Sequence, residues 1–526
     1  MHDKLNFFAG RVIAGRMSRR EFMGRAAALG LTAAAANSFM AGAVRAAGPQ
    51  MGGTIKVGIQ GGGSSDSLDP ALAANATATM VLRMWGEPLV ELKAGGGLEG
   101  KVAESYSSSP DAKTWTFKIR KGITFSNGKT VTAEDVKATL ERHSGEDTKS
   151  GALGLLRDIK SMSASGDEFT LELNQANADL PYLMADYHLI IQPNGGKDDP
   201  TAAVGTGPYV LKSAEPGVRF VFDKNADHWA GDGNASTIEM IVINDDTARV
   251  AALQSGQVDM IDRVPPRTAG LVARAPNIDV RTTSGPGHYV FIMHCNTAPF
   301  DNNDVRLALK YGINRQEMVD KILFGYGSVG NDTPINAAYP LYTELPQRDY
   351  DPDKAAFHMK KSGYDGSILL RTSDNSFPGA PDAAALFQQS CGAAGINVEI
   401  KREPNDGYWS EVWNAKPFCT SYWGGRPTQD QMYSTAYLST ADWNDTRFKN
   451  EKFDQLLIAA RAELDEAKRT QMYADMGTIL HNEGGLICPM FNDFLDATST
   501  RIAGWDESAG FGLMNYYAPI KMWVAA

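Results

Sequence analysis

Alternating apolar and polar positions predict strands at several places along the chain. Residues 53–59 read as a first strand, and residues 115–119 and 218–222 alternate with the period of a half-buried strand. Two more strands are predicted later in the chain, at residues 396–400 and 486–491. The strands are short and widely separated, so other elements must fill the intervals between them.

Apolar residues spaced three and four positions apart predict helices in those intervals. Thr132 has the place of an N-cap, with Asp135 three residues later, and Asp351 with Pro352 opens a helix that ends at Gly363. Further helices are predicted at residues 247–254, 304–311, 316–324 and 381–389, and as two charged amphipathic helices between about 452 and 481. This irregular mixture, without an internal repeat, indicates α/β or α+β lobes.

The first 46 residues have the order of an export signal. Arg19 and Arg20 are followed by Phe22, then by an Ala-rich apolar run over residues 26–44 and a small-residue stretch. Paired arginines before a weakly apolar core are typical of a twin-arginine signal, with cleavage expected near Ala46 or Ala47. An Ala-rich amphipathic first helix is the alternative interpretation.

Charge and hydropathy exclude several partners. Without the 7 basic and 2 acidic residues of positions 1–46, the chain holds 44 basic and 60 acidic residues, a net charge of −16. Nucleic acid and anionic lipid both require a basic surface, so neither is an expected partner. No later stretch approaches the roughly 18 apolar residues of a membrane span, and we expect no direct membrane insertion.

The size and the cysteines describe a large exported protein. About 480 residues remain after the signal, more than one core usually organises, so two or three packed lobes are expected. The four cysteines, Cys295, Cys391, Cys419 and Cys488, form no C-x-x-C pair. The periplasm permits disulfides, and sequence leaves three complete pairings open beside four reduced thiols.

Catalytic and metal-binding patterns are missing from the sequence. None of the eight histidines forms an H-E-x-x-H motif, and His288 and His294 on one strand would lie too far apart to share a metal. There is no G-x-S-x-G motif. We therefore predict no enzyme activity, no cofactor and no metal. A hydrolase would need a nucleophile beside a base, and a holdase would need a broad exposed apolar patch.

Aromatic residues gather near one glycine-rich loop. Trp409 and Trp413 are spaced for one helix face and are expected to pack in the core. Trp423 is followed by Gly424 and Gly425, which break the strand and let a backbone approach a ligand. The same region holds Tyr422, Trp443 and Asn444, and Asn331 is a further hydrogen-bonding candidate; together these form an expected ligand-binding wall.

Several segments, in order, resemble the peptide/nickel/opine class of ABC-importer solute-binding proteins, family 5. They cover essentially the whole chain after the signal, and the ordered set is specific although each piece alone is weak. The segments are residues 67–70, 115–129, 132–136, 205–209, 256–259, 299–306 and 350–352. The resemblance implies a small-molecule ligand, a membrane permease with its ATPase as partner, and a periplasmic monomer.

The resemblance also implies the fold, a periplasmic binding protein-like two-jaw α/β (mixed α+β) fold with an extra lobe, of class II and cluster C type. Lobe I would comprise residues 47–94, 204–292 and 484–526, lobe II residues 95–203, and lobe III residues 293–483. The strands carrying Cys295 and Cys488 would be the two hinge crossings, which could bring these cysteines close together.

One residue departs from the peptide-binding relatives. Where they carry an aspartate for the peptide ammonium, three positions after Trp423, this chain has Arg426. A guanidinium about 4 Å from an ammonium would cost about 4 kcal/mol at an effective dielectric near 20, whereas it can fork onto a carboxylate. We therefore expect an acidic or acceptor-rich solute, such as an opine, a modified amino acid or a sugar derivative.

Two alternatives to this reading of Arg426 remain open. Arg426 can instead point to solvent or pair internally, as loop arginines often do. If the loop is shortened, Asp430 could bind the ammonium, and the protein would be a di- or oligopeptide-binding protein.

Overall fold

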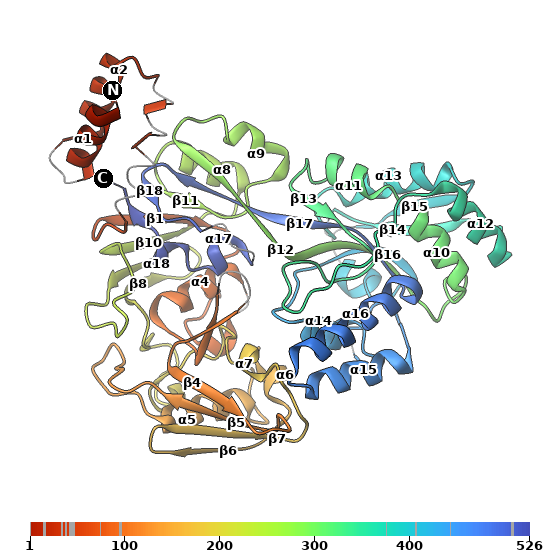
Figure 1. Ribbon diagram of the computed structural model, residues 1–526, viewed down its shortest axis with the longest axis horizontal. Coiled ribbons are helices and arrows are strands. Elements are labelled where there is room, and N and C mark those ends of the chain that lie inside the picture. The colour runs from red at the N-terminus through yellow and green to blue at the C-terminus, as the bar shows by residue number, and fades with distance from the viewer. Residues whose placement is uncertain are drawn as a thin grey trace.

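The computed structural model describes residues 2–13, 17–32, 35–36, 39–40, 48–73, 75–93, 97–374, 376–404, 408–441, 443–506 and 510–525. Its largest element is an 11-stranded sheet that runs through the molecule (Figure 1). In spatial order the strands are β15 (Val398–Arg402), β14 (Ile368–Thr372), β16 (Phe418–Trp423), β12 (Ile278–Met293), β17 (Leu486–Ser499), β11 (Met260–Ile261), β1 (Thr54–Ile59), β10 (Thr237–Val242), β9 (Arg219–Lys224) and β8 (Tyr209–Glu215), with β13 (Gly327–Val329) paired to β17.

The antiparallel pair β12 and β17 connects the two halves of this sheet (Figure 1). Its ladder has an irregularity between Ser284 and His288, which we call the β12 bulge. The predicted strand at 486–491 was too short, because β17 continues to Ser499. Polar residues such as Asp493 and Asp496 interrupt the apolar pattern there, but main-chain pairing with β12 continues.

Buried apolar side chains form three main cores. The first core includes Ile55, Phe222, Ile238, Leu253 and Leu495. The second core includes Trp115, Phe117, Leu140, Phe169 and Leu183. The third core includes Phe291, Leu309, Phe387, Tyr433 and Leu480. Because β12 contributes Ile278 to the first core and Phe291 to the third, the crossing strands hold these two cores together.

The second core lies between a small antiparallel sheet and one helix. The sheet has the order β4 (Ala103–Ser108), β5 (Thr114–Ile119), β7 (Glu168–Leu173) and β6 (Ile159–Ser165). The predicted capping box is present on α5 (Ala133–Ser144), where Thr132 and Asp135 bond to each other's backbone. The remaining short elements around it are β2 (Val90–Leu92), β3 (Leu98–Gly100), α6 (Leu153–Leu156), α7 (Leu180–Leu183) and η2 (Pro193–Gly196).

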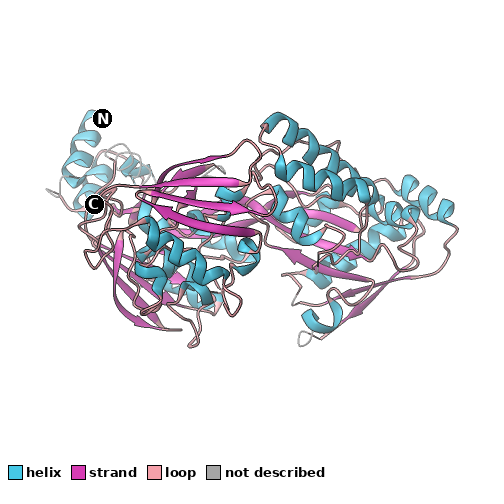
Figure 2. Ribbon diagram, turned by 90° about the horizontal axis from the view of Figure 1, so that it is seen from below, coloured by secondary structure: helices cyan, strands magenta, loops and turns pink. Residues whose placement is uncertain are grey.

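Helices cover the large sheet in both halves of the molecule (Figure 2). Beside the first core lie η1 (Pro70–Leu72), α4 (Ala76–Trp85), α8 (Asp246–Gln254), α9 (Pro266–Val272), α17 (Gly512–Asn515) and α18 (Ala518–Lys521), with the pair β18 (Ile502–Ala503) and β19 (Trp523–Val524). Beside the third core lie α10 (Asn303–Tyr311), α11 (Arg315–Lys321), α12 (Pro352–Ser362), α13 (Ala380–Gly392), α14 (Gln429–Ala436), α15 (Glu451–Ala462) and α16 (Glu466–Glu483).

The signals that predicted these helices act as expected. Asp351 caps α12, Pro352 occupies its first turn, and Gly363 ends it with a φ of +72°. The predicted helices at 247–254, 304–311 and 381–389 are α8, α10 and α13, within a few residues at each end. Local capping chemistry therefore fixed most helix boundaries.

The N-terminal segment forms two helices, α1 (His2–Ile13) and α2 (Arg19–Ala28), and Ser18 caps α2 with Glu21. Their apolar side chains meet Ala503 and Ala525 near the C-terminal end. The expected cleavage point at Ala46 or Ala47 falls outside the described residues. Among the described helices, none has the length and apolar character needed to cross a membrane.

All four cysteines are free thiols. The expected closeness of Cys295 and Cys488 is wrong. Met490 pairs with Tyr289 and Ile487 with Phe291, so Cys488 lies across from Val290, whereas Cys295 lies beyond the end of β12. The strands do run side by side, but their register separates the two sulfur atoms.

Candidate ligand-binding cleft

A cleft of about 900 Å³ opens between side chains that belong to different cores. One wall comes from α4, from residues 182–188 and from residues 515–517, and the other comes from the loop after β16, from α14 and from Trp443. Figure 1 shows α4 and α17 on one side and α14 on the other. This volume is typical of a small-molecule site.

The loop after β16 has a conformation that only glycine permits. Gly424 and Gly425, predicted to let the backbone approach a ligand, both line the cleft. Gly425 has a φ of +83°, and a β carbon there would lie 2.4 Å from Pro286. Pro286 belongs to the β12 bulge, so the loop is packed directly against the crossing strands.

Arg426 follows these glycines and also lines the cleft. Its backbone N–H donates to the Tyr339 hydroxyl at 3.1 Å, its Nη1 donates to the Gly425 carbonyl at 2.7 Å, and its guanidinium lies 5.6 Å from the centre of the Trp423 ring. No carboxylate of the described chain forms an ion pair with it, and burial lowers the pKa of its guanidinium. Arg426 is therefore a cation that the protein itself does not neutralise.

Three tryptophans form an edge-to-face cluster beside Arg426. Trp443 lines the cleft with 51% of its surface exposed, and its ring centre lies 5.9 Å from Trp413 and 6.0 Å from Trp423. The indole nitrogens of Trp413 and Trp423 donate to Asp445 at 3.0 and 3.3 Å. Burial raises the pKa of Asp445 to about 7. Trp423 thus supports the wall from behind, and Trp443 forms its surface.

The segment predicted to carry Trp409 and Trp413 on one helix face is π-helical. Residues Tyr408–Val412 form a π-helical turn, η3, and the Trp413 N–H donates to the Tyr408 carbonyl five residues earlier. Trp413 is half-buried in the third core, and the side chain of Trp409 falls outside the described residues.

The opposite wall carries a residue that sequence reasoning missed, Arg83. It lies in the last turn of α4 and is only 7% exposed. Its guanidinium lies 4.7 Å from the centre of the Tyr517 ring, and its Nε and Nη1 have no hydrogen-bond partner. The available signal was a single arginine within the apolar segment 76–85.

Tyr187 also lines the cleft and interacts electrostatically with both cations. Burial raises its pKa to about 12 and Asp186 adds to the rise, whereas Arg83 and Arg426 both oppose it. The two guanidiniums therefore act on the same phenol. Asp186 itself is engaged, since His188 Nδ1 lies 2.6 Å from its carboxylate.

The other predicted site residues do not line this cleft. Tyr422 is half exposed on the opposite face of β16 from Trp423. Asp430 is 5% exposed and pairs with Arg461 at 3.1 Å, so it already has a counter-ion. Asn444 is buried, and its amide donates to the carbonyls of Leu438 and Phe448. Asp430 and Asn444 therefore bond to partners inside the third core and do not reach the cleft.

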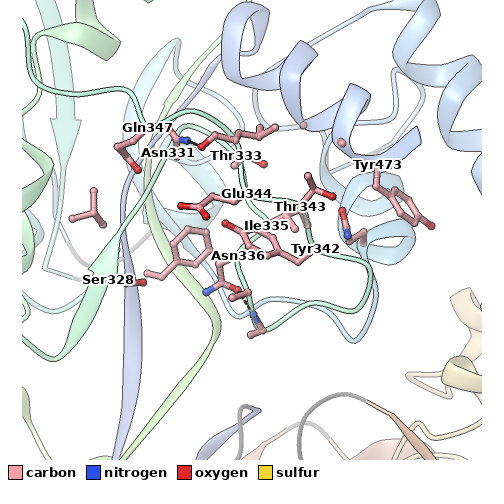
Figure 3. A pocket seen from close by; sticks show the side chains of 18 of the residues that line it. Ser328, Asn331, Thr333, Ile335, Asn336, Tyr342, Thr343, Glu344, Gln347 and Tyr473 are labelled. Carbon is pink, nitrogen blue, oxygen red and sulfur yellow. Dashed lines mark hydrogen bonds between the residues drawn. The ribbon is translucent and has the colours of Figure 1, made fainter. Parts of the chain in front are cut away.

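Asn331 lies at a different cavity, of about 440 Å³, between the loop 331–347 and α16 (Figure 3). Its amide donates to the carbonyls of Leu345 and Pro346, and its oxygen accepts from the Arg348 N–H. These bonds close the loop on itself. Asn331 therefore has a local structural role.

A contact beside the cleft joins the second core to the third. Asp179 forms an ion pair with Arg469 of α16, and both side chains are buried. Next to it the Ala178 N–H donates to the Arg461 carbonyl at 2.7 Å. We call these two interactions the Asp179–Arg469 latch.

Among the described residues, Glu87, His228 and Asp232 are close enough to hold a metal ion, with donor atoms within 4.8 Å. These atoms are already engaged. Glu87 accepts from Thr206 and from the Trp229 indole, and the His228 Nδ1 accepts from the Asp232 backbone. The cluster is a satisfied hydrogen-bond network.

A buried serine–histidine pair is also present, with Ser150 Oγ 2.6 Å from His143 Nδ1. In the part of the chain described, His143 Nε2 has no partner, so no carboxylate orients the ring. Burial lowers the pKa of His143 to about 4. The pair thus lacks the third group and the access of a hydrolase site.

Two cores joined by crossing strands, with a ligand-sized cleft between them, define a two-lobed solute-binding protein. Residues 97–445 match the family model of bacterial extracellular solute-binding proteins, family 5 Middle. The chain belongs to this family, as the sequence motifs indicated. It is therefore a substrate-binding component of an ABC importer.

Curated relatives and solved structures agree with this family. The chain is 27% identical over 466 residues to the glutathione-binding protein GsiB of Salmonella choleraesuis strain SC-B67, which covers 84% of this chain and 90% of the relative. It superimposes on the ABC transporter substrate-binding protein CtaP of Listeria monocytogenes with a TM-score of 0.80 at 19% identity, covering 91% and 100% of the two chains. It also superimposes on AgaA from A. tumefaciens R10, solved in complex with agropinic acid, with a TM-score of 0.73 at 24% identity. This match covers 90% of the present chain and 99% of AgaA. The predicted fold class is confirmed.

Proposed function

We propose that this protein captures a small acidic solute in the cleft and delivers it to the permease and ATPase of its importer. The observation that supports this proposal is Arg426, a cation in the cleft that has no carboxylate partner in the described chain. A carboxylate can accept two parallel hydrogen bonds from a guanidinium. The ligand would thus supply the missing counter-charge.

Capture would occur by closure of two jaws. In this proposal lobe I comprises residues 47–94, 204–292 and 484–526 and contains the first core. Lobe II, residues 95–203, contains the second core, and lobe III, residues 293–483, contains the third. β12 and β17 are the hinge, and the protein acts as a monomer in the periplasm after twin-arginine export. The Asp179–Arg469 latch would then connect lobes II and III when the jaws are closed.

A free-amine peptide is the less favoured ligand. Asp430, the candidate partner for its ammonium, is buried against Arg461 and does not line the cleft. Asp186 does line the cleft, but it is bonded to His188. A peptide ammonium beside Arg426 would meet a like charge, which costs energy, and among the lining residues only Asp186 carries a carboxylate that could offset it.

The names of the relatives are consistent with an acid. GsiB is called a glutathione-binding protein, and AgaA was solved with agropinic acid. Agropinic acid carries a carboxylate, and glutathione carries two carboxylates together with one ammonium, so its affinity also tests how the cleft tolerates an amine. We therefore place both chemistries at the head of the ligand panel.

The test is a thermal-shift screen of the purified protein, stripped of co-purified ligand by unfolding and refolding. The panel contains opines, glutathione, organic acids, free-amine peptides, oligosaccharides and polyamines. A ligand at 100 times its dissociation constant adds about 2.7 kcal/mol to the free energy of unfolding, enough for a visible shift. We expect acids to give the shift, and Arg426→Gln to abolish it.

Arg274→Gln, at an exposed arginine outside the cleft, is the matched control and should behave as wild type. Stabilisation by free-amine peptides, with loss in Asp430→Ala and retention in Arg426→Gln, would replace the proposal with a peptide-binding function. Stabilisation only by neutral oligosaccharides would also overturn it.

A further inference from the structure

Arg83 lies in an environment that does not suit a cation. Every residue of α4 is buried, and most of them are apolar. A buried charge loses its hydration, and proteins usually compensate with a carboxylate and with hydrogen bonds to every donor. Arg83 has a contact with the Tyr517 ring, but its Nε and Nη1 have no partner and it forms no ion pair within the described chain. The fold therefore keeps a buried cation that is compensated by an aromatic ring and not, among the described residues, by a carboxylate.

The nearby carboxylates are engaged by groups other than Arg83: Glu91 by two ammonium groups, and Glu87 by neutral hydrogen-bond donors. Glu91 lies 3.3 Å from the Lys101 ammonium and 3.6 Å from that of Lys521. Glu87 accepts hydrogen bonds from Thr206 and the Trp229 indole. Arg83 is thus left without a counter-ion beside residues that could have provided one.

Arg83 and Arg426 line the same cleft from opposite walls, and Tyr187 interacts electrostatically with both. The third arginine of the lining differs from them, because Arg263 lies 3.8 Å from Asp262 and is largely exposed. Two unneutralised cations therefore face one space, one from the α4 side and one from the β16 side.

We infer that the ligand carries two anionic groups, one bound by Arg83 and the other by Arg426. This inference rests on the proposed function, since it assumes an acidic solute. Each jaw would hold one end of the dianion, so the ligand itself bridges the jaws and favours the closed form. Trp443 offers an apolar surface to the part between the two charges. A monoanion could satisfy only one guanidinium and would leave the other buried and unpaired.

The experiment compares ligands that differ by one charge. Isothermal titration calorimetry is run with two probe pairs: glutathione with its glycine monoethyl ester, and straight-chain dicarboxylates from succinate to suberate with their monomethyl esters. In the wild type we expect at least one dianion to bind tenfold or more tightly than its monoester. In Arg83→Gln that preference should disappear, because monoester and dianion then bind alike.

A second measurement separates a ligand-binding role from a structural one. Without ligand, Arg83→Met removes an unpaired buried cation and should raise the melting temperature. An arginine that only supports the fold would instead give a lower melting temperature when replaced. Arg274→Met is the control for the substitution itself.

Each failure has its own pattern. Acids that bind without preference for the second charge, or a preference that survives in Arg83→Gln, would overturn this inference and leave the proposed function intact. Binding of neutral or cationic probes only, or of no acid at all, would overturn the proposed function and this inference with it. A melting temperature that falls in Arg83→Met would contradict the claim that Arg83 lacks a compensating carboxylate within the described chain.

Discussion

Arg315 and Arg348 lie in the third core around Asp332, whereas Arg83 and Arg426 lie in the cleft and form no ion pair in the described chain. Arg315 donates to both oxygens of Asp332 at 2.7 Å, and Arg348 donates to one of them at 3.0 Å. All three of these core side chains are buried. The comparison separates two settings of a guanidinium: in the third core the fold supplies the anion, and in the cleft we propose that the ligand supplies it.

This difference has a consequence for stability and for binding. Replacing one partner of a buried ion pair leaves the other charge unpaired, so the core cluster should be sensitive to mutation. Replacing a cation without a partner in the fold should change the free energy of unfolding little, whereas it should lower the affinity for the proposed acidic ligand strongly. Four predictions test this separation.

The largest effect is expected for Asp332→Asn, which leaves two guanidiniums and the nearby buried Lys310 without their anion. We expect the free energy of unfolding to fall by about 3–5 kcal/mol, measured by urea denaturation. Asp301→Asn, at an exposed aspartate, is the control. A loss below about 1 kcal/mol would show that the core pair is not the stabilising unit we describe.

Asp332 also gives this prediction a pH dependence. Burial alone would raise the pKa of its carboxyl, but Arg315, Arg348 and Lys310 outweigh burial and hold the pKa below its usual range. The stabilisation is thus present above the ordinary aspartate pKa near 4 and is lost as the pH falls through the lower folded value. In Asp332→Asn this part of the acid unfolding curve should be absent.

The second effect concerns Arg426→Asp, which reverses the charge at the cleft. Hydrogen bonds to charged groups are worth about 1.5–3 kcal/mol, so loss of the guanidinium should lower the affinity for an acidic ligand about ten- to a hundredfold. Repulsion by the new carboxylate should lower the affinity further. Calorimetry with the acid identified in the screen measures the loss. Arg274→Asp controls for net charge, and an unchanged dissociation constant in Arg426→Asp would remove Arg426 from the site.

A smaller effect is expected from Asp179→Asn, which removes the anion of the latch. If the jaws open as proposed, water can hydrate Arg469, so we expect loss of the ion pair to weaken closure and to leave the free energy of global unfolding little changed. Ligand affinity should drop about tenfold, or about 1.4 kcal/mol, while the free energy of unfolding without ligand stays within about 1 kcal/mol of wild type. Asp199→Asn, on the surface of the same segment, is the control. Small-angle scattering that shows equal closure in both proteins would argue against the latch.

The smallest effect concerns the Asp445 carboxyl behind the tryptophan wall. Burial raises its pKa to about 7, while the indoles of Trp413 and Trp423 and the Arg447 guanidinium oppose the rise. Its folded pKa thus exceeds the unfolded value, so its stabilising contribution is greatest below about pH 4 and is lost as the pH rises towards 7. Tryptophan emission should titrate near pH 7 in the wild type and not in Asp445→Asn, with ligand affinity changed less than about threefold. Identical titrations in both proteins would assign the change to another group.

Local signals predicted much of the fold, and they failed where long-range pairing decides. Thr132 and Gly363 set helix ends through contacts with residues a few positions away, so the sequence was sufficient. β17 was cut short in the prediction because its second half contains Asp493 and Asp496, and only its pairing with β12 keeps that half extended. The cysteine prediction failed for a related reason, since strand register is not visible in one strand alone.

The residues of the candidate site also divide into those that local sequence predicts and those that depend on long-range contacts. The glycine-rich loop gave Arg426, because a break after an apolar strand is a local feature. Arg83 was missed, since it joins the cleft only when residues more than 300 positions apart meet. Asp430 and Asn444 were expected to contact ligand because they are polar and nearby in sequence, but Arg461 and backbone carbonyls satisfy them internally. Polarity alone does not show which way a side chain faces.

The contact between Gly425 and Pro286 limits how this protein can change its ligand. The side chains at positions 83, 426 and 443 can vary while the backbone stays in place, so new specificities can arise there by single substitutions. Position 425 has no such freedom, because any β carbon would collide with the bulge of a crossing strand. Selection for a different solute can therefore exchange the side chains that line the cleft, but it cannot remodel the loop without also altering the strands that join the first and third cores.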